Sequence, residues 1–163
     1  MVGGTVLYTI LIVLHAAAGV AAFVAGCAVL VPRAPEPRAR RLFDLYLGSL
    51  GLMVVFVAAA VATHWRQLTT AEQVIFGGLL LLALFMTWRA VAARRLRWRA
   101  AGDWRRPYME HVGFTLIALW EGFVIVLAID LGAPGWLVAV LAVLGLVAGT
   151  RALHRAEARA LPA

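Results

Sequence analysis

Apolar residues form five long runs along this chain of 163 residues, and short segments that collect the polar and charged residues separate them. Each run is close to the roughly 20 residues that a helix needs to cross the hydrocarbon core of a bilayer. We therefore predict an all-α fold, a polytopic bundle of transmembrane helices that forms a single domain over residues 1–163. The predicted spans cover about residues 5–31, 42–64, 71–93, 108–130 and 134–153.

The composition agrees with this pattern and excludes several other classes. Hydrophobic residues make up 64% of the chain and charged residues 14%, far from the balance of a soluble domain. Cys27 is the single cysteine, which excludes a disulfide framework and a thiolate-rich metal site. The chain carries no GxSxG, P-loop, Rossmann or HExxH motif, so nothing in it indicates a soluble type of enzyme.

All fifteen basic residues are arginine, and they set the predicted orientation of the chain. Fourteen of them fall in three segments, 32–41, 89–106 and 151–159, which the five spans place on one side of the membrane. The positive-inside rule makes that side cytoplasmic, with the N-terminus outside and the C-terminus inside. The net charge of +7 then indicates contact with anionic lipid head groups of a bacterial plasma membrane, not with nucleic acid.

Small residues recur at helical spacing on three of the predicted spans. His15 shares its face of the first span with small residues, and Asp44 does so on the second. The fifth span carries a GxxxG pattern. Small residues at such spacing let helix backbones approach closely inside a membrane. The glycines that we expect at helix contacts are Gly19, Gly26, Gly48, Gly51, Gly145 and Gly149.

Glu121 lies inside the apolar sequence ALWEGFVIV and is the most unusual residue of the chain. With a helical rise of about 1.5 Å per residue, it lies roughly 3 Å outward of the membrane centre and His15 about 4 to 5 Å outward. These two can pair, and Glu110 lies three helical turns before Glu121 on the same face. Asp44 and His111 both lie about 12 to 13 Å inward and form a second candidate pair.

The ionisable residues leave several functions open. A buried centre of His15 and Glu121 is either a structural hydrogen bond between helices, as in an accessory subunit, or a site for proton- or ion-linked transport or for a small ligand. A protein this small is expected to self-associate or to bind a partner membrane subunit. No cofactor is predicted. The alternative is electron transfer through a b-type haem, for which His111 and His154 are the closest pair in depth.

The residues from Leu14 to Gly19, LHAAAG, and the second run RRLFDLYLGSLGLMVVFVAAAV resemble uncharacterised small bacterial membrane families whose first helix carries an H-x-x-x-G signature. The segment LFMTWRAVAARR is similar to the end of their third helix. The resemblance covers about the first hundred residues and implies a multi-spanning plasma-membrane protein of unknown function. It carries over only His15 and Gly19, and it departs from the pattern at Asp44, where a second His-Arg is expected.

Overall fold

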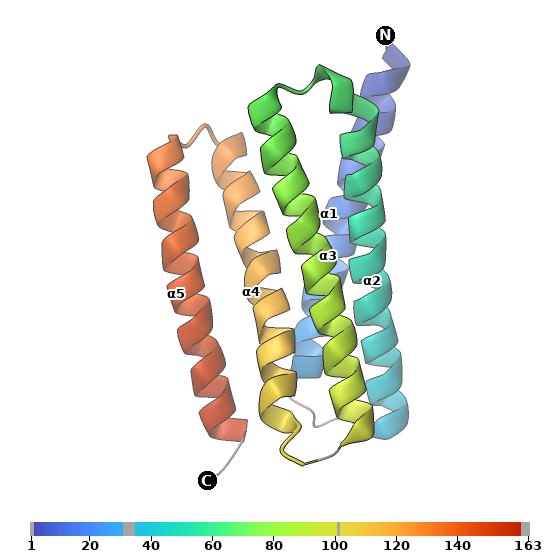
Figure 1. Cartoon of the computed structure of the whole chain (residues 1–163), viewed down its shortest axis with the longest axis vertical. Helices are drawn as coiled ribbons and strands as arrows, with labels where there is room; N and C mark the ends of the chain where they lie inside the picture. Colours follow the sequence, from blue (N-terminus) through green and yellow to red (C-terminus); the bar gives the residue numbers. More distant parts are fainter. Residues whose placement is uncertain (1, 31–34, 101, 161–163) are drawn as a thin grey trace.

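The computed structural model describes residues 2–30, 35–100 and 102–160, and almost all of them are helical (Figure 1). Each of the five long helices is long and apolar enough to cross a membrane, which confirms the predicted all-α bundle with five candidate spans. A short 3-10 helix, η1 (Trp65–Gln67), follows the second of them. The long helices are α1 (Val2–Leu30), α2 (Glu36–His64), α3 (Thr70–Arg99), α4 (Arg105–Asp130) and α5 (Gly135–Ala160).

The helices continue past the predicted spans wherever the sequence is rich in arginine. Helix α2 begins at Glu36, well before residue 42, because Pro35 caps it and Pro37 occupies its first turn, where a proline costs no hydrogen bond. Residues 36–41 of the arginine-rich segment 32–41 therefore belong to α2, and Pro32 lies outside the described residues. Helix α3 continues past residue 93 and carries its basic residues as far as Arg99.

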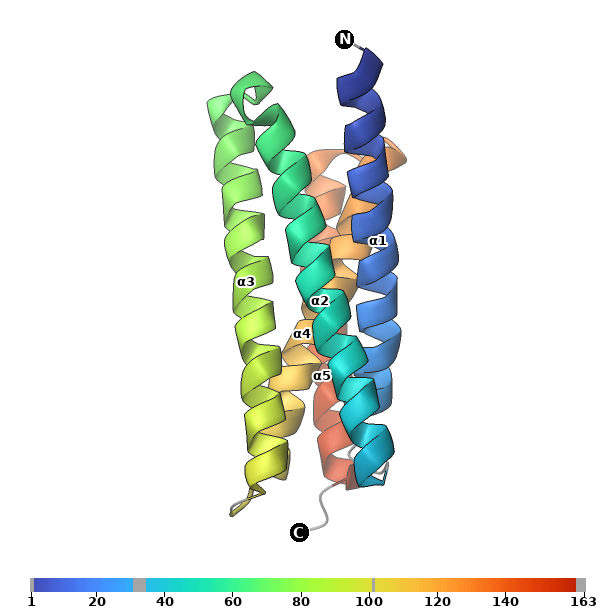
Figure 2. The ribbon, with the colours of Figure 1, turned by 90° about the vertical axis from the view of Figure 1, so that its right-hand side faces the viewer.

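Four of the helices form a ring, and the fifth lies outside it. Each of α1, α2, α3 and α4 packs against the next, and α4 also packs against α1. Helix α2 stands between α1 and α3, and α5 runs along α4 at the edge of the bundle (Figures 1 and 2). Helices α2 and α4 are thus diagonal, and α4 provides the main contact between α5 and the ring.

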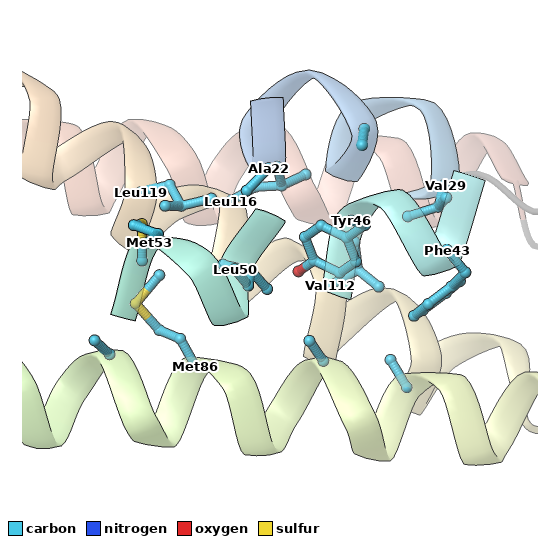
Figure 3. Packing of buried hydrophobic residues seen from close by; sticks show 14 of the residues in the cluster. Ala22, Val29, Phe43, Tyr46, Leu50, Met53, Met86, Val112, Leu116 and Leu119 are labelled. Atoms are coloured by element: carbon cyan, nitrogen blue, oxygen red, sulfur yellow. The ribbon is translucent and has the colours of Figure 1, made fainter. Parts of the chain in front are cut away.

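Buried apolar side chains of α1 to α4 form one cluster inside the ring (Figure 3), and its largest fully buried members include Phe43, Tyr46 and Tyr108, toward the arginine-rich end. The Phe43 ring meets the Trp98 ring edge-on at 5.4 Å. The Tyr108 hydroxyl donates a hydrogen bond to the Val29 carbonyl and accepts one from Arg97 Nη1 at 3.3 Å. The described side chains of α5 include none that is fully buried. The core is therefore that of a four-helix bundle.

A tight turn joins α4 to α5, as the sequence DLGAPG predicts. The amide of Ala133 donates to the Ala128 carbonyl at 2.9 Å, and Gly132 has φ of +76°. Glycine takes this left-handed conformation at the end of a helix without a steric penalty. The chain reverses within a few residues, so α4 and α5 are antiparallel neighbours.

Candidate functional site

His15 contacts the backbone of a neighbouring helix and not the carboxylate of Glu121. Its Nδ1 lies 2.9 Å from the Met53 carbonyl oxygen of α2. Because a carbonyl can only accept, Nδ1 carries the proton in this contact. The expected His15–Glu121 pair is therefore corrected: α1 turns this imidazole toward α2, and the carboxylate of Glu121 is directed elsewhere.

Glu121 belongs to a ladder of three contacts that holds α5 on α4. Successive contacts are four residues apart on each helix, so each lies about one turn from the next. At each level a side chain of one helix faces a glycine of the other. We call this ladder the α4–α5 seam, and its pairs are Gly113 with Leu153, Ile117 with Gly149, and Glu121 with Gly145.

The two carboxylate oxygens of Glu121 are buried at the Gly145 level of the seam. Neither oxygen has a hydrogen-bond partner within the part of the chain that the structure describes. A methyl group at Gly145 would collide with the carboxylate, so the glycine is what makes room for it. One level along, the apolar Ile117 fills the same kind of space at Gly149. Glu121 is thus a carboxylate in a position shaped for an aliphatic side chain.

Glu110 shares the face of Glu121 but differs from it in its surroundings. It is exposed, and its Oε1 lies 3.4 Å from Arg106 Nε. The residues between the two carboxylates on that face are engaged in packing: Phe114 lies under the guanidinium of Arg89, and Ile117 lies on Gly149. A continuous polar path from Glu110 to Glu121 is therefore not formed by the described side chains.

Asp44 and His111 make separate contacts, and both contacts are with α3. Asp44 Oδ1 forms an ion pair with Arg94 Nη2 of α3 at 2.6 Å. His111 lies edge-on to Trp88 of α3, with the ring centres 6.3 Å apart, and its Nδ1 is buried without a hydrogen-bond partner among the described residues. The expected Asp44–His111 pair is corrected to two separate contacts with α3.

The glycines divide into two groups. Gly19 of α1 lies against Phe123 and Met53, and a Cβ at Gly26 would lie 2.7 Å from Leu116. Together with Gly145 and Gly149, these are helix contacts. The expectation for Gly48 and Gly51 is corrected, because a Cβ at either of them would meet no atom within 4 Å.

The histidines that would hold a haem are spread over the bundle. His111 lies on the face of α4 that packs against α3. His154 is exposed on α5, and α5 packs against another face of α4, the one that contains Gly113. His64 lies at the opposite end of the molecule beside Tyr8, with the ring centres 4.6 Å apart. In the described ranges, no three His, Cys, Asp or Glu side chains gather in a group that could hold a metal ion. Haem binding stays a prediction.

Sequence reasoning missed two of the residues that matter most. Gly113, which receives Leu153 in the seam, does not belong to a repeating small-residue pattern. Arg89 was counted with the arginine-rich connection, yet its guanidinium lies between α3 and α4, 4.6 Å from the centre of the Phe114 ring. The spacing of Arg89 and Phe114 along the chain gives no signal of this contact.

Fold and site together define a bundle of five candidate membrane-spanning helices, a four-helix ring that carries a fifth helix on a seam with a buried carboxylate. No protein-family model matches the chain, and comparison with curated proteins and with solved structures gives no match either. The resemblance of the first hundred residues to small bacterial membrane families accordingly stays a prediction.

Proposed function

We propose that this chain is a proton-linked membrane protein in which Glu121 takes up and releases a proton at the α4–α5 seam. The observation that carries the proposal is the burial of both carboxylate oxygens against Gly145 without a hydrogen-bond partner among the described residues. An ionisable side chain inside a membrane span is costly, and such residues mark proton and ion pathways more often than other positions do.

The free-energy cost of ionising Glu121 depends on whether α5 is packed on α4. A carboxylate near the bilayer centre costs at least about 2.5 kcal/mol, and more without a partner. No described side chain of α1, α4 or α5 offers a cation to it, since His15 bonds to Met53 and the nearest arginine of α5 in sequence, Arg151, is six residues beyond Gly145. The docked seam therefore favours the neutral, protonated carboxyl group. The ionised group favours a separated seam into which water enters.

Infrared difference spectroscopy of the protein in a bilayer tests this proposal. Protonated Glu121 contributes a carboxyl C=O stretch that disappears on deprotonation, and Glu121→Gln removes this signal. The matched control is Glu110→Gln, because Glu110 is exposed and paired with Arg106, so its loss leaves the signal in place. A spectrum in which Glu121→Gln changes nothing rejects the proton site. A signal that responds to sodium and not to pH assigns the site to a cation.

A second candidate function is that of an accessory subunit. The observation in its favour is that α5 packs mainly on α4 and leaves large apolar side chains exposed, among them Val143 and Leu144. A second copy or another membrane subunit would pack there. Cross-linking from Trp136, which is 68% exposed on α5, separates the two candidates. A cross-linked partner together with a silent Glu121→Gln variant favours the accessory role.

We also propose that the arginine-rich end faces the cytoplasm of a bacterium, because short loops rich in arginine are retained on that side. Single cysteines in a Cys27→Ala background test the orientation. An impermeant thiol reagent added to intact cells is expected to label Leu131→Cys, in the α4–α5 turn, and not Asp103→Cys, in the α3–α4 turn. The reverse labelling inverts the orientation.

A further inference from the structure

Arg89 is a cation inside the apolar part of α3, and aromatic rings surround it. Its Cζ lies 4.6 Å from the centre of the Phe114 ring and 5.8 Å from that of Phe85. Its Nη2 donates to the main-chain carbonyl of Glu110 at 3.1 Å. The guanidinium thereby lies between α3 and α4, and we call its position beside Phe85, Phe114 and the Glu110 carbonyl the α3–α4 crevice.

No carboxylate among the described residues pairs with Arg89. The carboxylate of Glu110 is turned to Arg106, and that of Asp44 is engaged by Arg94. Within the described ranges, no ion pair includes Arg89, and its Nε has no hydrogen-bond partner. Nδ1 of the neighbouring His111 is also buried without a partner there. Arg89 is half-buried, and its Nε is shielded from solvent, so an anion beside it would supply both a counter-charge and a hydrogen-bond acceptor.

We propose that the α3–α4 crevice binds the phosphate group of an anionic phospholipid through Arg89. Arginine presents its donors in a planar fork that matches two oxygens of a phosphate. Arg89 lies about seven residues past the middle of its predicted span, roughly 10 Å toward the arginine-rich end, from which a guanidinium can reach the head-group layer. The charge of the crevice and its depth both fit this ligand.

The surroundings of Arg89 favour a lipid over the carboxylate of another protein. Trp88 is 58% exposed beside the crevice, as expected of an aromatic residue at a membrane interface. Leu84 and Leu81 lie about one and two turns farther into the span on the face of Trp88, and they are 51% and 69% exposed. An acyl chain can follow these leucines and Trp88 while its phosphate meets Arg89 beside them.

Native mass spectrometry of the protein from nanodiscs tests the site. The discs contain equal amounts of phosphatidylglycerol and phosphatidylcholine. We expect the wild-type protein to retain one phosphatidylglycerol in preference to phosphatidylcholine. Arg89→Gln is expected to weaken this preference roughly tenfold, since hydrogen bonds to a charged group are lost. Arg95→Gln is the matched control, an exposed arginine on the same helix with no contact to the crevice, and it should keep the preference.

Arg89→Lys provides the second variant if Arg89→Gln does not fold. It keeps the charge but loses the fork, so we expect an intermediate preference. Equal loss in Arg89→Gln and Arg95→Gln would show attraction by the overall charge and overturn the site. An unchanged preference in both Arg89 variants overturns it as well. A dimer mass in the wild-type protein that Arg89→Gln abolishes would assign the anion to a second copy of the chain and not to a lipid.

Discussion

Glycines line both the α1–α2 contact and the α4–α5 seam, but they are enclosed differently in the two places. In both, glycines of one helix receive side chains of a neighbour, which permits close approach inside a membrane. The glycines of α1 are enclosed from two sides, because Gly26 meets Tyr46 of α2 and Leu116 of α4. The nearest side chains to Gly145 and Gly149 of α5 both belong to α4. We expect a small-residue face to hold a helix more firmly when two neighbours share it.

The two contacts also differ in whether their polar side chain has a hydrogen-bond partner. His15 has a partner, the Met53 carbonyl, and so it adds a hydrogen bond to the α1–α2 contact. Glu121 has none among the described residues and adds a desolvation cost to the seam unless it is neutral. The first contact is independent of protonation at Glu121, whereas the second is not. The comparison separates a permanent core of four helices from a fifth helix held conditionally.

Filling Gly26 is expected to produce the largest effect. In Gly26→Leu the new side chain collides with Leu116 and Tyr46 at the centre of the ring. Overpacking of this kind costs about 1–3 kcal/mol and disturbs three helices at once. Thermal unfolding in detergent, followed by circular dichroism, should show a large fall in the midpoint.

The control for Gly26 is Gly51→Leu on α2, where the added side chain meets open space. It should leave the midpoint unchanged or raise it slightly, because glycine is a poor helix former. If both variants unfold alike, the two-sided enclosure of Gly26 does not explain its role.

Filling Gly145 should release α5 and leave the ring intact. Gly145→Leu collides with Glu121 and so opens the seam, with a penalty again of about 1–3 kcal/mol but confined to one interface. Hydrogen exchange should rise in α5 while α1 to α3 keep their protection. Gly122→Leu, a neighbour of Glu121 whose Cβ would meet nothing within 4 Å, serves as the control. Global unfolding of Gly145→Leu would contradict the independence of the ring.

Much of the fold could be predicted because length and hydropathy determine it. Five apolar runs gave five helices, and the turn around Gly132 gave antiparallel α4 and α5. The start of α2 was missed, because the apolar run that predicts the span begins at residue 42, whereas the first turn of the helix accepts the proline before it. The order of helices in the ring could not be predicted, since apolar residues surround every span and no face of a span indicates which helix it will pack against.

Less of the site could be predicted, because the depth of a residue in the membrane does not determine which neighbouring helix its side chain faces. His15 and Glu121 were placed at similar depth, but which neighbour each faces depends on how α1 and α4 rotate about their axes. Gly51 illustrates the same limit: its spacing on α2 is typical of a contact, and its side of the helix is open. Arg89 was missed because in the sequence it is the first residue of the arginine-rich segment 89–106. In the structure its guanidinium lies between α3 and α4.

Removing the imidazole of His15 is expected to have a moderate effect. His15→Leu loses the hydrogen bond to Met53 but keeps an apolar side chain in the α1–α2 contact. Hydrogen bonds between helices in membranes average about 0.6 kcal/mol and reach about 1.7. Unfolding in a denaturing detergent should detect a loss in this range. Thr87→Val is the control, since its hydroxyl bonds within its own helix, to the Ala83 carbonyl. A loss no larger than that of the control would make the imidazole contact energetically neutral.

The ion pair of Asp44 with Arg94 is expected to have the smallest effect. Its side chains are 57% and 45% exposed, so water and salt screen the attraction. A double-mutant cycle of Asp44→Asn and Arg94→Gln should give a coupling of about 0.2–1 kcal/mol that shrinks as salt is added. The corresponding cycle of Asp44→Asn with His111→Gln should give none, because α2 and α4 are diagonal. A coupling to His111 as large as that to Arg94 would mean that α2 and α4 lie closer together in the bilayer, and the ring order itself would have to be revised.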